Sequence, residues 1–245
     1  MKIICIIQAR MGSERLPGKD IKPIKGVPLI GYTIDRLKRS RYIDEIILAT
    51  SDKEQDDKLV DVAQEYKIEC FRGSEENVLE RYVKCAKKYN GDIIIRITGD
   101  CPLIDPIIVD NVITKLIIYK YDYVRLDVPN TFIRGFDVEV FTKECLLKTY
   151  NIVNEIYGEI INKYKEHVTL FIYENKELFN IGYVLGEKEF YRDYRICVDT
   201  IEDFQVVENI IENLKEDELR FSNIVSYIDE SNINYINKET VQKNN

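Results

Sequence analysis

Short apolar runs alternate with segments of helical periodicity through the first half of the chain. Runs rich in isoleucine and valine predict strands at residues 2–7, 45–50, 68–71 and 92–98. Apolar residues at helical spacing predict helices at 28–39, 56–66, 77–89 and 106–119. Nearly continuous apolar strands separated by helices are typical of a buried parallel sheet with right-handed crossovers. The pattern predicts an α/β fold with a doubly wound, mostly parallel sheet, whose ligands bind beyond the carboxyl ends of the strands.

The pattern is looser after residue 120. Strands are predicted at 122–126, 137–141, 180–185 and 194–199, and a mainly helical segment at 143–164. Residues 167–173 could open a further short helix, and 202–214 are predicted to form the closing helix. The sequence contains no internal repeat and no low-complexity linker. Residues 1–237 are therefore predicted to form a single domain, followed by a polar tail at 238–245.

The composition narrows the functional classes. The chain has 245 residues and a net charge of −8, and an acidic chain disfavours general nucleic-acid binding. No stretch reaches the eighteen or so apolar residues of a membrane span, and the N-terminus is predicted to be a strand rather than a signal peptide. The six cysteines stand far apart without a CxxC pair, which indicates reduced, mostly buried thiols. Together these features predict a cytoplasmic protein that binds neither nucleic acid nor membrane.

A basic loop, QARMGSERLPGKD, follows the first predicted strand. It carries three cations, one hydroxyl and two glycines: Arg10, Arg15, Lys19, Ser13, Gly12 and Gly18. Glycine allows positive φ or close approach of the backbone to a ligand, while arginine and lysine bind phosphate oxygens. The loop therefore predicts a cradle for a polyphosphate. A solvated basic turn is the alternative.

The Walker A loop, GxxxxGK[ST], is the nearest competing motif. Here five residues rather than four separate the two glycines, and Asp20 follows Lys19 where a Walker A loop carries a hydroxyl. An acid at that position repels phosphate. The chain also lacks the GxGxxG fingerprint of dinucleotide-binding proteins. Both a P-loop NTPase and a dinucleotide-dependent dehydrogenase are disfavoured.

Two aspartates far apart in the sequence, Asp100 and Asp199, follow predicted strands. Asp100 lies in ITGDCPLIDP, and Asp199 ends RICVD just before Thr200, which can cap the next helix. Because the strand ends of a doubly wound sheet converge on one edge, we expect the two carboxylates to face a common cavity beside the basic loop. Mg²⁺ is typically held by one or two carboxylates plus substrate phosphates. The pair predicts a Mg²⁺ site, with a turn residue and a helix cap as the alternative.

Five segments of the sequence together resemble a known family: RMGSERLPGK, TGDCPLIDP, RGFDVEVF, EHVTLFIYEN and VDTIEDF. In this order they resemble the SpsF-like cytidylyltransferases of the spore-coat polysaccharide group, which are related to CMP-sialate and CMP-KDO synthetases. The resemblance covers about residues 3–213. It implies a GT-A-like nucleotide-diphospho-sugar transferase fold, a homodimer, and CTP with Mg²⁺ as cosubstrates.

The resemblance also implies roles for individual residues. Arg10, Ser13, Arg15 and Lys19 should line the CTP site with Gly12, with Arg10 and Lys19 nearest the phosphates. Asp100 should hold Mg²⁺, with Asp199 as its second carboxylate. Ser74 and Asn77 lie where related enzymes carry base- and ribose-reading residues. Val78 stands where the KDO enzymes carry arginine, and the loop departs from the RxGSKxxxxK form of sialate synthetases, so neither acceptor is implied.

The acceptor side is predicted from RGFDVEVF and the single histidine. Arg134 could bind a carboxylate or phosphate through two parallel hydrogen bonds. Asp137, Glu139 and His167 are the other acceptor-side candidates, with an ordinary strand and a structural histidine as the alternatives.

The predicted reaction transfers CMP from CTP to a sugar or sugar acid of the ulosonic or nonulosonic type. Pyrophosphate is released, and the product would serve surface polysaccharide synthesis. Three alternatives remain: a phosphorylated acceptor that gives a CDP-linked product, a GT-A glycosyltransferase, and a CTP-binding regulator without turnover.

Overall fold

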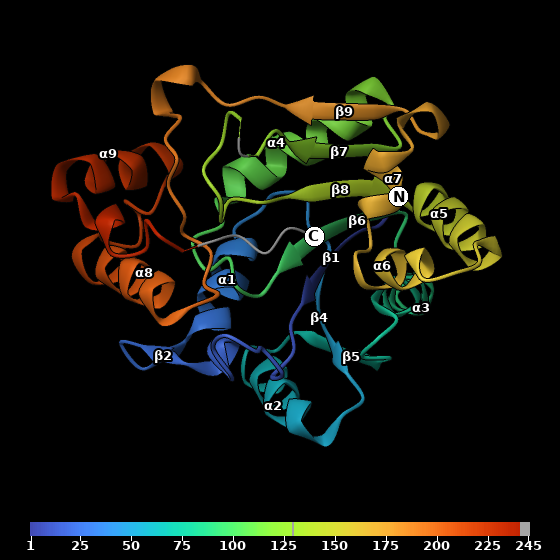
Figure 1. Cartoon of the computed structure of the whole chain (residues 1–245), viewed down its shortest axis with the longest axis horizontal. Coiled ribbons are helices and arrows are strands. Elements are labelled where there is room, and N and C mark those ends of the chain that lie inside the picture. Colours follow the sequence, from blue (N-terminus) through green and yellow to red (C-terminus); the bar gives the residue numbers. More distant parts are fainter. Residues whose placement is uncertain (129, 241–245) are drawn as a thin grey trace.

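A seven-stranded sheet forms the centre of the protein. The computed structural model describes residues 1–128 and 130–240. The strand order is β5-β4-β1-β6-β8-β7-β9 (Figure 1). The bounds are β5 Glu69–Gly73, β4 Glu45–Ser51, β1 Ile3–Gln8, β6 Ile93–Thr98, β8 Glu139–Thr142, β7 Tyr123–Leu126 and β9 Ile181–Val184. Only the two pairs that involve β8 are antiparallel, so the predicted mostly parallel sheet is confirmed.

Helices cover both faces of the sheet, as the doubly wound pattern predicts. On one face lie α1 (Leu29–Leu37), α2 (Asp57–Glu65) and α4 (Pro106–Tyr119), and on the other α3 (Val78–Lys88), α5 (Lys143–Glu155), α6 (Ile160–Glu166) and α7 (Leu170–Glu174). Two further helices, α8 (Ile201–Asn213) and α9 (Phe221–Ser231), lie side by side at one end of the molecule (Figure 1). The chain therefore has two apolar layers, one on each face of the sheet.

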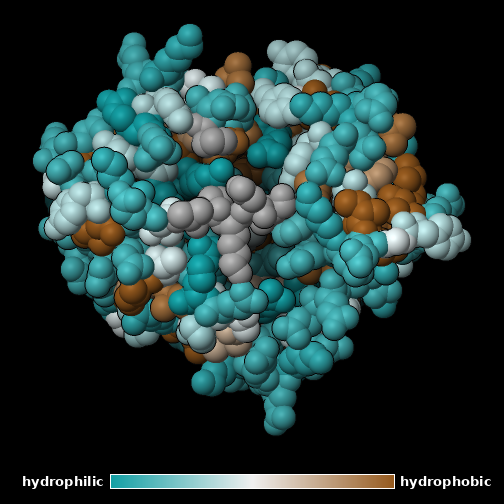
Figure 2. All heavy atoms as spheres, in the orientation of Figure 1, coloured by the Kyte–Doolittle hydropathy of each residue, from teal (hydrophilic) through white to brown (hydrophobic). Residues whose placement is uncertain are grey.

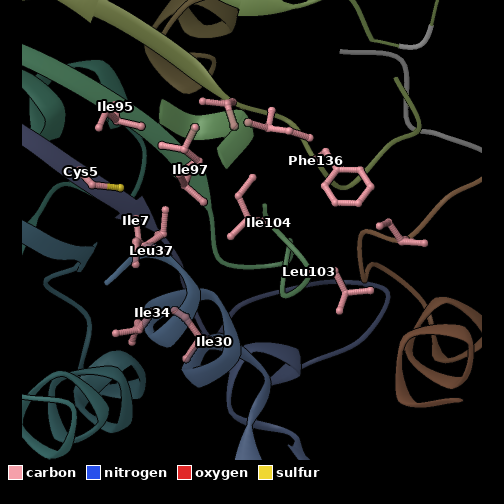
Figure 3. Close-up of a cluster of buried hydrophobic side chains, with 14 of the residues drawn as sticks. Cys5, Ile7, Ile30, Ile34, Leu37, Ile95, Ile97, Leu103, Ile104 and Phe136 are labelled. Atoms are coloured by element: carbon pink, nitrogen blue, oxygen red, sulfur yellow. The ribbon is translucent and has the colours of Figure 1, made fainter. Parts of the chain in front are cut away.

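Alternation along β1 divides its side chains between these layers. Cys5 and Ile7 belong to the cluster under α1, whereas Ile4 and Ile6 belong to the cluster under α3. Figure 3 shows the first cluster, in which β1 and β6 side chains pack against α1. Burial raises the pKa of the Cys5 thiol far above its usual range, which keeps it protonated. All six cysteines are free and five of them are buried, in agreement with the prediction of reduced thiols.

Several predicted elements differ from the structure. Residues 194–199 are not a strand, because they bond first to the backbone of Arg134 and then to that of Asp100 instead of pairing along one strand. The helix at 202–214 does not close the fold, since α9 follows it. The predicted helix at 143–164 is two helices, with Gly158 at a φ of 96° between them.

Smaller differences concern the ends of the chain and a short hairpin. The pattern missed β2 (Pro23–Ile24) and β3 (Val27–Pro28), which are too short to show periodicity. Part of the predicted polar tail, from residue 241 onward, lies outside the described residues. Within the described part of the chain, no helix combines the length and apolar character needed to cross a bilayer.

Candidate active site

Two cavities meet at the carboxyl ends of β1 and β6. The smaller, of about 290 Å³, lies between the loop at 10–20, the start of α3 and these strand ends. The larger, of about 460 Å³, is lined by residues of β6, β7, β8 and α7 and by the segment around Asp199. The ends of β1 and β6 point to the middle of the molecule in Figure 1, and the coloured atoms around the middle of Figure 2 are mostly hydrophilic. Four residues line both cavities, namely Arg15, Thr98, Asp100 and Asp199.

Asp100 and Asp199 lie together at this junction. The Val198 backbone N–H donates to the Asp100 carbonyl at 2.8 Å, which brings the two segments side by side. One ammonium joins the carboxylates: Lys19 Nζ lies 2.9 Å from Asp100 Oδ2 and 2.8 Å from Asp199 Oδ1. Burial alone would lower the pKa of this ammonium, but the carboxylates of Asp100, Asp20 and Asp199 outweigh burial and raise it. The junction therefore already binds one cation between two carboxylates.

The same carboxylates can be tested as ligands for a divalent cation. The described residues contain no cluster of three or more metal-binding side chains. Mg²⁺ commonly takes only one or two protein carboxylates and completes its shell with phosphate oxygens and water. Asp100 and Asp199 converge on a single cation and fit that donor set. Because Lys19 Nζ now lies between them, a metal ion there requires the ammonium to move away.

A buried network orients Asp199. Asp203 accepts hydrogen bonds from the backbone N–H groups of Asp199 and Thr200, and Thr200 caps α8 in return. The Arg195 guanidinium contacts both Asp199 and Asp203. Burial raises the pKa of Asp199, but Lys19, Arg195 and a third cation, Arg15, hold it below its usual value. The expected cap at Thr200 is confirmed. Sequence analysis missed Arg195 and Asp203, although an acid three residues after Thr200 is the signature of a capping box and could have singled out Asp203.

The basic loop is held at both ends. Asp56 is fully buried and accepts hydrogen bonds from the Met11 backbone at 2.8 Å and from Thr50. Gly18 has a φ of 69°, a left-handed conformation that favours glycine, and its N–H donates to the Met11 carbonyl. The structure places Arg10, Ser13, Arg15 and Lys19 on the wall of the smaller cavity. Gly12 is not among the residues that line this cavity, and it lies near the side chains of Gln55 and Glu75.

The two predicted base-reading residues lie elsewhere. Ser74 Oγ accepts from the Asn77 backbone N–H, and Asn77 Oδ1 accepts from the Glu80 backbone N–H as the cap of α3. Neither side chain lines either cavity. The α3 residues that do line the smaller cavity are Val78 and Arg81.

All four predicted acceptor-side residues line the larger cavity. Glu139 is held by Arg96, Tyr123 and Thr169, which all donate to its carboxylate. Burial would raise the pKa of Glu139, but Arg96 and the other donors lower it, so the carboxylate stays ionised. Glu139 thus belongs to a closed network.

Arg134, Asp137 and His167 are less constrained. The Arg134 guanidinium makes no ion pair or side-chain hydrogen bond with any described residue. Among the described residues, the Asp137 carboxylate accepts a hydrogen bond only from the Gly135 N–H, and burial raises the pKa of Asp137. Burial also lowers the pKa of His167 below its usual 6.5, which favours the neutral imidazole.

Two further arginines line the larger cavity and were missed by sequence analysis. Arg96 lies on β6 and Arg125 on β7. Each is the single charged residue of an apolar strand, which in the sequence resembles the ordinary alternation of polar and apolar positions. Arg125 stacks on the Tyr173 ring at 5.1 Å and donates to the Leu126 carbonyl. Arg96 has one nitrogen, Nε, that is buried without a partner among the described residues. With Arg15 and Arg134, these two residues bring the number of arginines that line the larger cavity to four.

Comparison with known proteins agrees with this geometry. The sequence matches the cytidylyltransferase family over residues 4–239. It is 34% identical over 220 residues to the spore coat polysaccharide biosynthesis protein SpsF of Bacillus subtilis, a match that covers 87% of this chain and 88% of that protein.

Solved structures place the fold in the same group. The chain is similar to a cytidylyltransferase from Leptospira borgpetersenii with a TM-score of 0.88 and 32% identity, over 100% of both chains. It shares its fold with a CMP:2-keto-3-deoxy-manno-octonic acid synthetase complexed with CTP, at a TM-score of 0.64 and 17% identity, over 86% of this chain and 99% of that one. The chain belongs to the cytidylyltransferase family, and it is a CTP-dependent nucleotidyltransferase.

Proposed function

We propose that the enzyme binds CTP in the smaller cavity and transfers its CMP group to an acidic sugar bound in the larger cavity. One observation carries this proposal: Arg15, Thr98, Asp100 and Asp199 line both cavities. A group transfer between two substrates requires a point at which both reach the same catalytic side chains. The junction is such a point, and its two carboxylates and neighbouring cations suit a reaction at phosphorus.

The smaller cavity suits the triphosphate. Arg10, Arg15 and Lys19 provide three cations, and Ser13 adds a hydroxyl. Arginine can bind phosphate through two parallel hydrogen bonds, whereas lysine acts as a point charge. The side chain of Arg10 is 45% exposed and that of Lys19 only 10%, so the charges extend from the cavity mouth to its base. We assign the α-phosphate to the base, beside Asp100 and Asp199.

The larger cavity suits an anionic acceptor. Four of its lining residues are arginines, and one of them, Arg96, is neutralised by Glu139. Arg134 forms no ion pair with a described residue, although its charge opposes the rise in the pKa of Asp137, and it can bind a carboxylate in a bidentate manner. The same arginines could bind the phosphate of a phosphorylated acceptor, which would give a CDP-linked product. We favour the sugar acid because, among the described residues, Arg134 alone of the four arginines has neither an ion pair nor a side-chain hydrogen bond, and one such guanidinium matches one carboxylate.

The reaction is an in-line displacement at the α-phosphorus. An acceptor oxygen forms a bond to this phosphorus, the bond to the bridging oxygen of the β-phosphate breaks, and pyrophosphate leaves. Lys19, Arg10 and Arg15 stabilise the negative charge that develops on the leaving oxygens. Mg²⁺, held by Asp100 and Asp199 together with phosphate oxygens, would supply further charge stabilisation. The proton of a sugar hydroxyl acceptor can pass to Asp137 or neutral His167, both of which face the larger cavity.

The biological role follows from the family. The relative from Bacillus subtilis is called a spore coat polysaccharide biosynthesis protein. We infer that the nucleotide-activated product serves the synthesis of a surface polysaccharide, and that the enzyme acts as a cytoplasmic homodimer.

Pyrophosphate release tests the proposal. Each of the four nucleoside triphosphates is incubated with Mg²⁺ and a panel of neutral sugars, sugar acids and sugar phosphates. Release is expected only with CTP and a sugar acid. Release with a sugar phosphate instead would assign the CDP-linked alternative, and no release with any acceptor would favour a CTP-binding regulator.

A further inference from the structure

Three residues that line the smaller cavity carry a buried polar atom without a hydrogen-bond partner among the described residues. One is Oδ1 of Asp20, in the basic loop; the other two are Oε1 of Gln8 and Nε of Arg81. Gln8 is the last residue of β1 and points to the α3 side of the sheet, and Arg81 lies in α3; both line the cavity. Buried polar groups are almost always hydrogen-bonded, and unpaired groups at a cavity wall are typical of a binding site whose ligand supplies the partner.

The Arg81 guanidinium has few interaction partners, both as a charge and as a hydrogen-bond donor. It is 2% exposed, yet it forms no ion pair with any described carboxylate. Within the described part of the chain, its one side-chain hydrogen bond runs from Nη1 to the Ser74 carbonyl at 2.9 Å. Burial lowers the pKa of Arg81, because nearby carboxylates do not fully offset the cost of burying its positive charge. A ligand with hydrogen-bond acceptors would complete the environment of this guanidinium.

The two atoms differ in polarity, which limits the ligand. Gln8 Oε1 accepts a hydrogen bond, whereas Arg81 Nε donates one. Phosphate offers acceptors alone and satisfies only Arg81. The apolar side chain of Val78, which is 4% exposed, lines the same cavity. An apolar wall beside one acceptor and one donor fits a flat heteroaromatic ring with a mixed polar edge.

The position within the cavity agrees with a base rather than a phosphate. The loop cations and the Asp100–Asp199 pair are the charged groups assigned to the triphosphate. Gln8, Val78 and Arg81 belong to the side of the sheet covered by α3. Cytosine presents an exocyclic amine next to two acceptors, ring N3 and O2, along one edge.

We infer that Gln8 and Arg81 select cytosine: Gln8 Oε1 accepts from the 4-amino group, and Arg81 donates to N3 and O2. Uracil presents a carbonyl oxygen at position 4 and an N–H at position 3. The N–H faces the Arg81 donor, so uracil loses this contact even if the Gln8 amide turns over. This inference rests on the proposed function, because it assigns the base of the same nucleotide.

A cytosine analogue without the amine tests the Gln8 contact. The triphosphate of the 2-pyrimidinone riboside is compared with CTP by calorimetry in the presence of Mg²⁺. Wild-type protein is expected to bind CTP about tenfold more tightly than the analogue, as expected for one hydrogen bond. Gln8→Met is expected to weaken CTP binding to the level of the analogue and to leave the analogue unchanged. Gln64→Met, on the exposed side of α2, is the matched control and should keep the wild-type ratio.

Arg81→Lys tests the second contact, since it keeps the charge and removes the Nε donor. The preference for CTP over UTP is expected to fall by about tenfold, while binding of inorganic tripolyphosphate stays unchanged. Weaker tripolyphosphate binding would assign Arg81 to the phosphates and overturn its role. Thermal unfolding checks that this buried variant folds, and Gln8→Met tests the inference independently.

Failure of the proposed function can be distinguished from failure of the base-reading role of Gln8 and Arg81. If wild-type protein binds the four nucleoside triphosphates equally, the proposed cytidylyl transfer itself fails. If it prefers CTP but Gln8→Met retains the same ratio of CTP to analogue affinity as Gln64→Met, only the base-reading role is overturned.

Discussion

The two cavities that meet at Asp100 and Asp199 are built in different ways. The cations of the smaller cavity come from a single loop, which is held by Asp56 and by the left-handed Gly18. In the larger cavity three charged groups stand on neighbouring strands, Arg96 on β6, Arg125 on β7 and Glu139 on β8. Glu139 accepts hydrogen bonds from side chains of β6, β7 and the residue before α7. We expect the loop side chains to adjust when a nucleotide binds, whereas the strand residues Arg96, Arg125 and Glu139 present a fixed pattern of charge.

This difference separates the tasks of the two cavities. A polyphosphate is bound by several cations that can each adjust, so a loop suits it. Choice among acceptors requires fixed donors and acceptors, because discrimination arises when a wrong substrate leaves buried polar groups unpaired. We therefore expect loop substitutions to affect turnover broadly, and substitutions in the larger cavity to affect acceptor use alone.

The largest effect is expected at the junction, which belongs to both cavities. Asp100→Asn and Asp199→Asn keep the size of the side chain but remove a negative charge from the cation site. Turnover should fall on the order of a hundredfold or more, with partial rescue at high Mg²⁺ or Mn²⁺. CTP binding through the loop should persist in calorimetry. Asp193→Asn, an exposed position nearby, is the control, and near-normal turnover in both junction variants would contradict the shared site.

Substitutions of Lys19 are expected to have the next largest effect on turnover, and they test the loop that lines the smaller cavity. Lys19→Ala removes one charge-assisted phosphate contact, worth about 1.5–3 kcal/mol, so turnover should fall roughly ten- to a hundredfold. Lys19→Met removes the ammonium that lies between Asp100 and Asp199, so nucleotide-free protein should bind Mn²⁺ more tightly than wild type. Electron paramagnetic resonance measures the bound Mn²⁺. Equal or weaker binding in Lys19→Met would show that the ammonium does not compete with a metal.

Arg134 tests the larger cavity by itself. Arg134→Lys keeps the charge but loses the bidentate geometry, so the KM for a sugar acid should rise about tenfold with little change in the KM for CTP. Steady-state kinetics with each substrate varied in turn measures the split. Arg41→Lys, at the exposed start of the loop before β4, serves as the control. Equal changes in both KM values would remove the distinction between the two cavities.

The smallest effect concerns pH and Asp20, beside the junction. Burial raises the pKa of this carboxyl from 3.8 to about 7, and its Oδ1 has no partner among the described residues. The folded state therefore binds a proton that the unfolded state has released between these values, so wild-type stability should fall as pH rises from about 4 to about 7. Asp20→Asn should lack this loss. The difference in Tm between variant and wild type is expected to grow over that range, and a constant difference would contradict the raised pKa.

Much of the fold could be predicted because local pattern and tertiary structure agree there. The strands β1, β4 and β6 are apolar runs buried on both faces, so hydrophobicity alone marks them. The segment at 194–199 has a similar pattern but no continuous partner strand, and only its backbone contacts with Arg134 and Asp100 reveal this. Strand pairing is a tertiary property and cannot be derived from one segment.

The candidate site was predictable where chemistry concentrates in a short motif. Arg10, Ser13, Arg15 and Lys19 lie in one loop, and Asp100 and Asp199 each follow a strand-like run. Arg96, Arg125 and Gln8 were missed because each occupies an ordinary alternating position in a strand. Ser74 and Asn77 were proposed from the resemblance to related enzymes, but polar residues directly before a helix are equally the signature of a cap. Asn77 caps α3, and Ser74 accepts a hydrogen bond from the Asn77 backbone.

The fate of each phosphorus of CTP tests the central claim most directly. Single-turnover reactions are run with a sugar acid and CTP labelled at either the α- or the γ-phosphorus, and the products are separated. Transfer of CMP across the junction predicts that the α-label joins the acceptor and the γ-label leaves in pyrophosphate. Appearance of the γ-label on the acceptor, or release of either label without an acceptor product, would contradict the account.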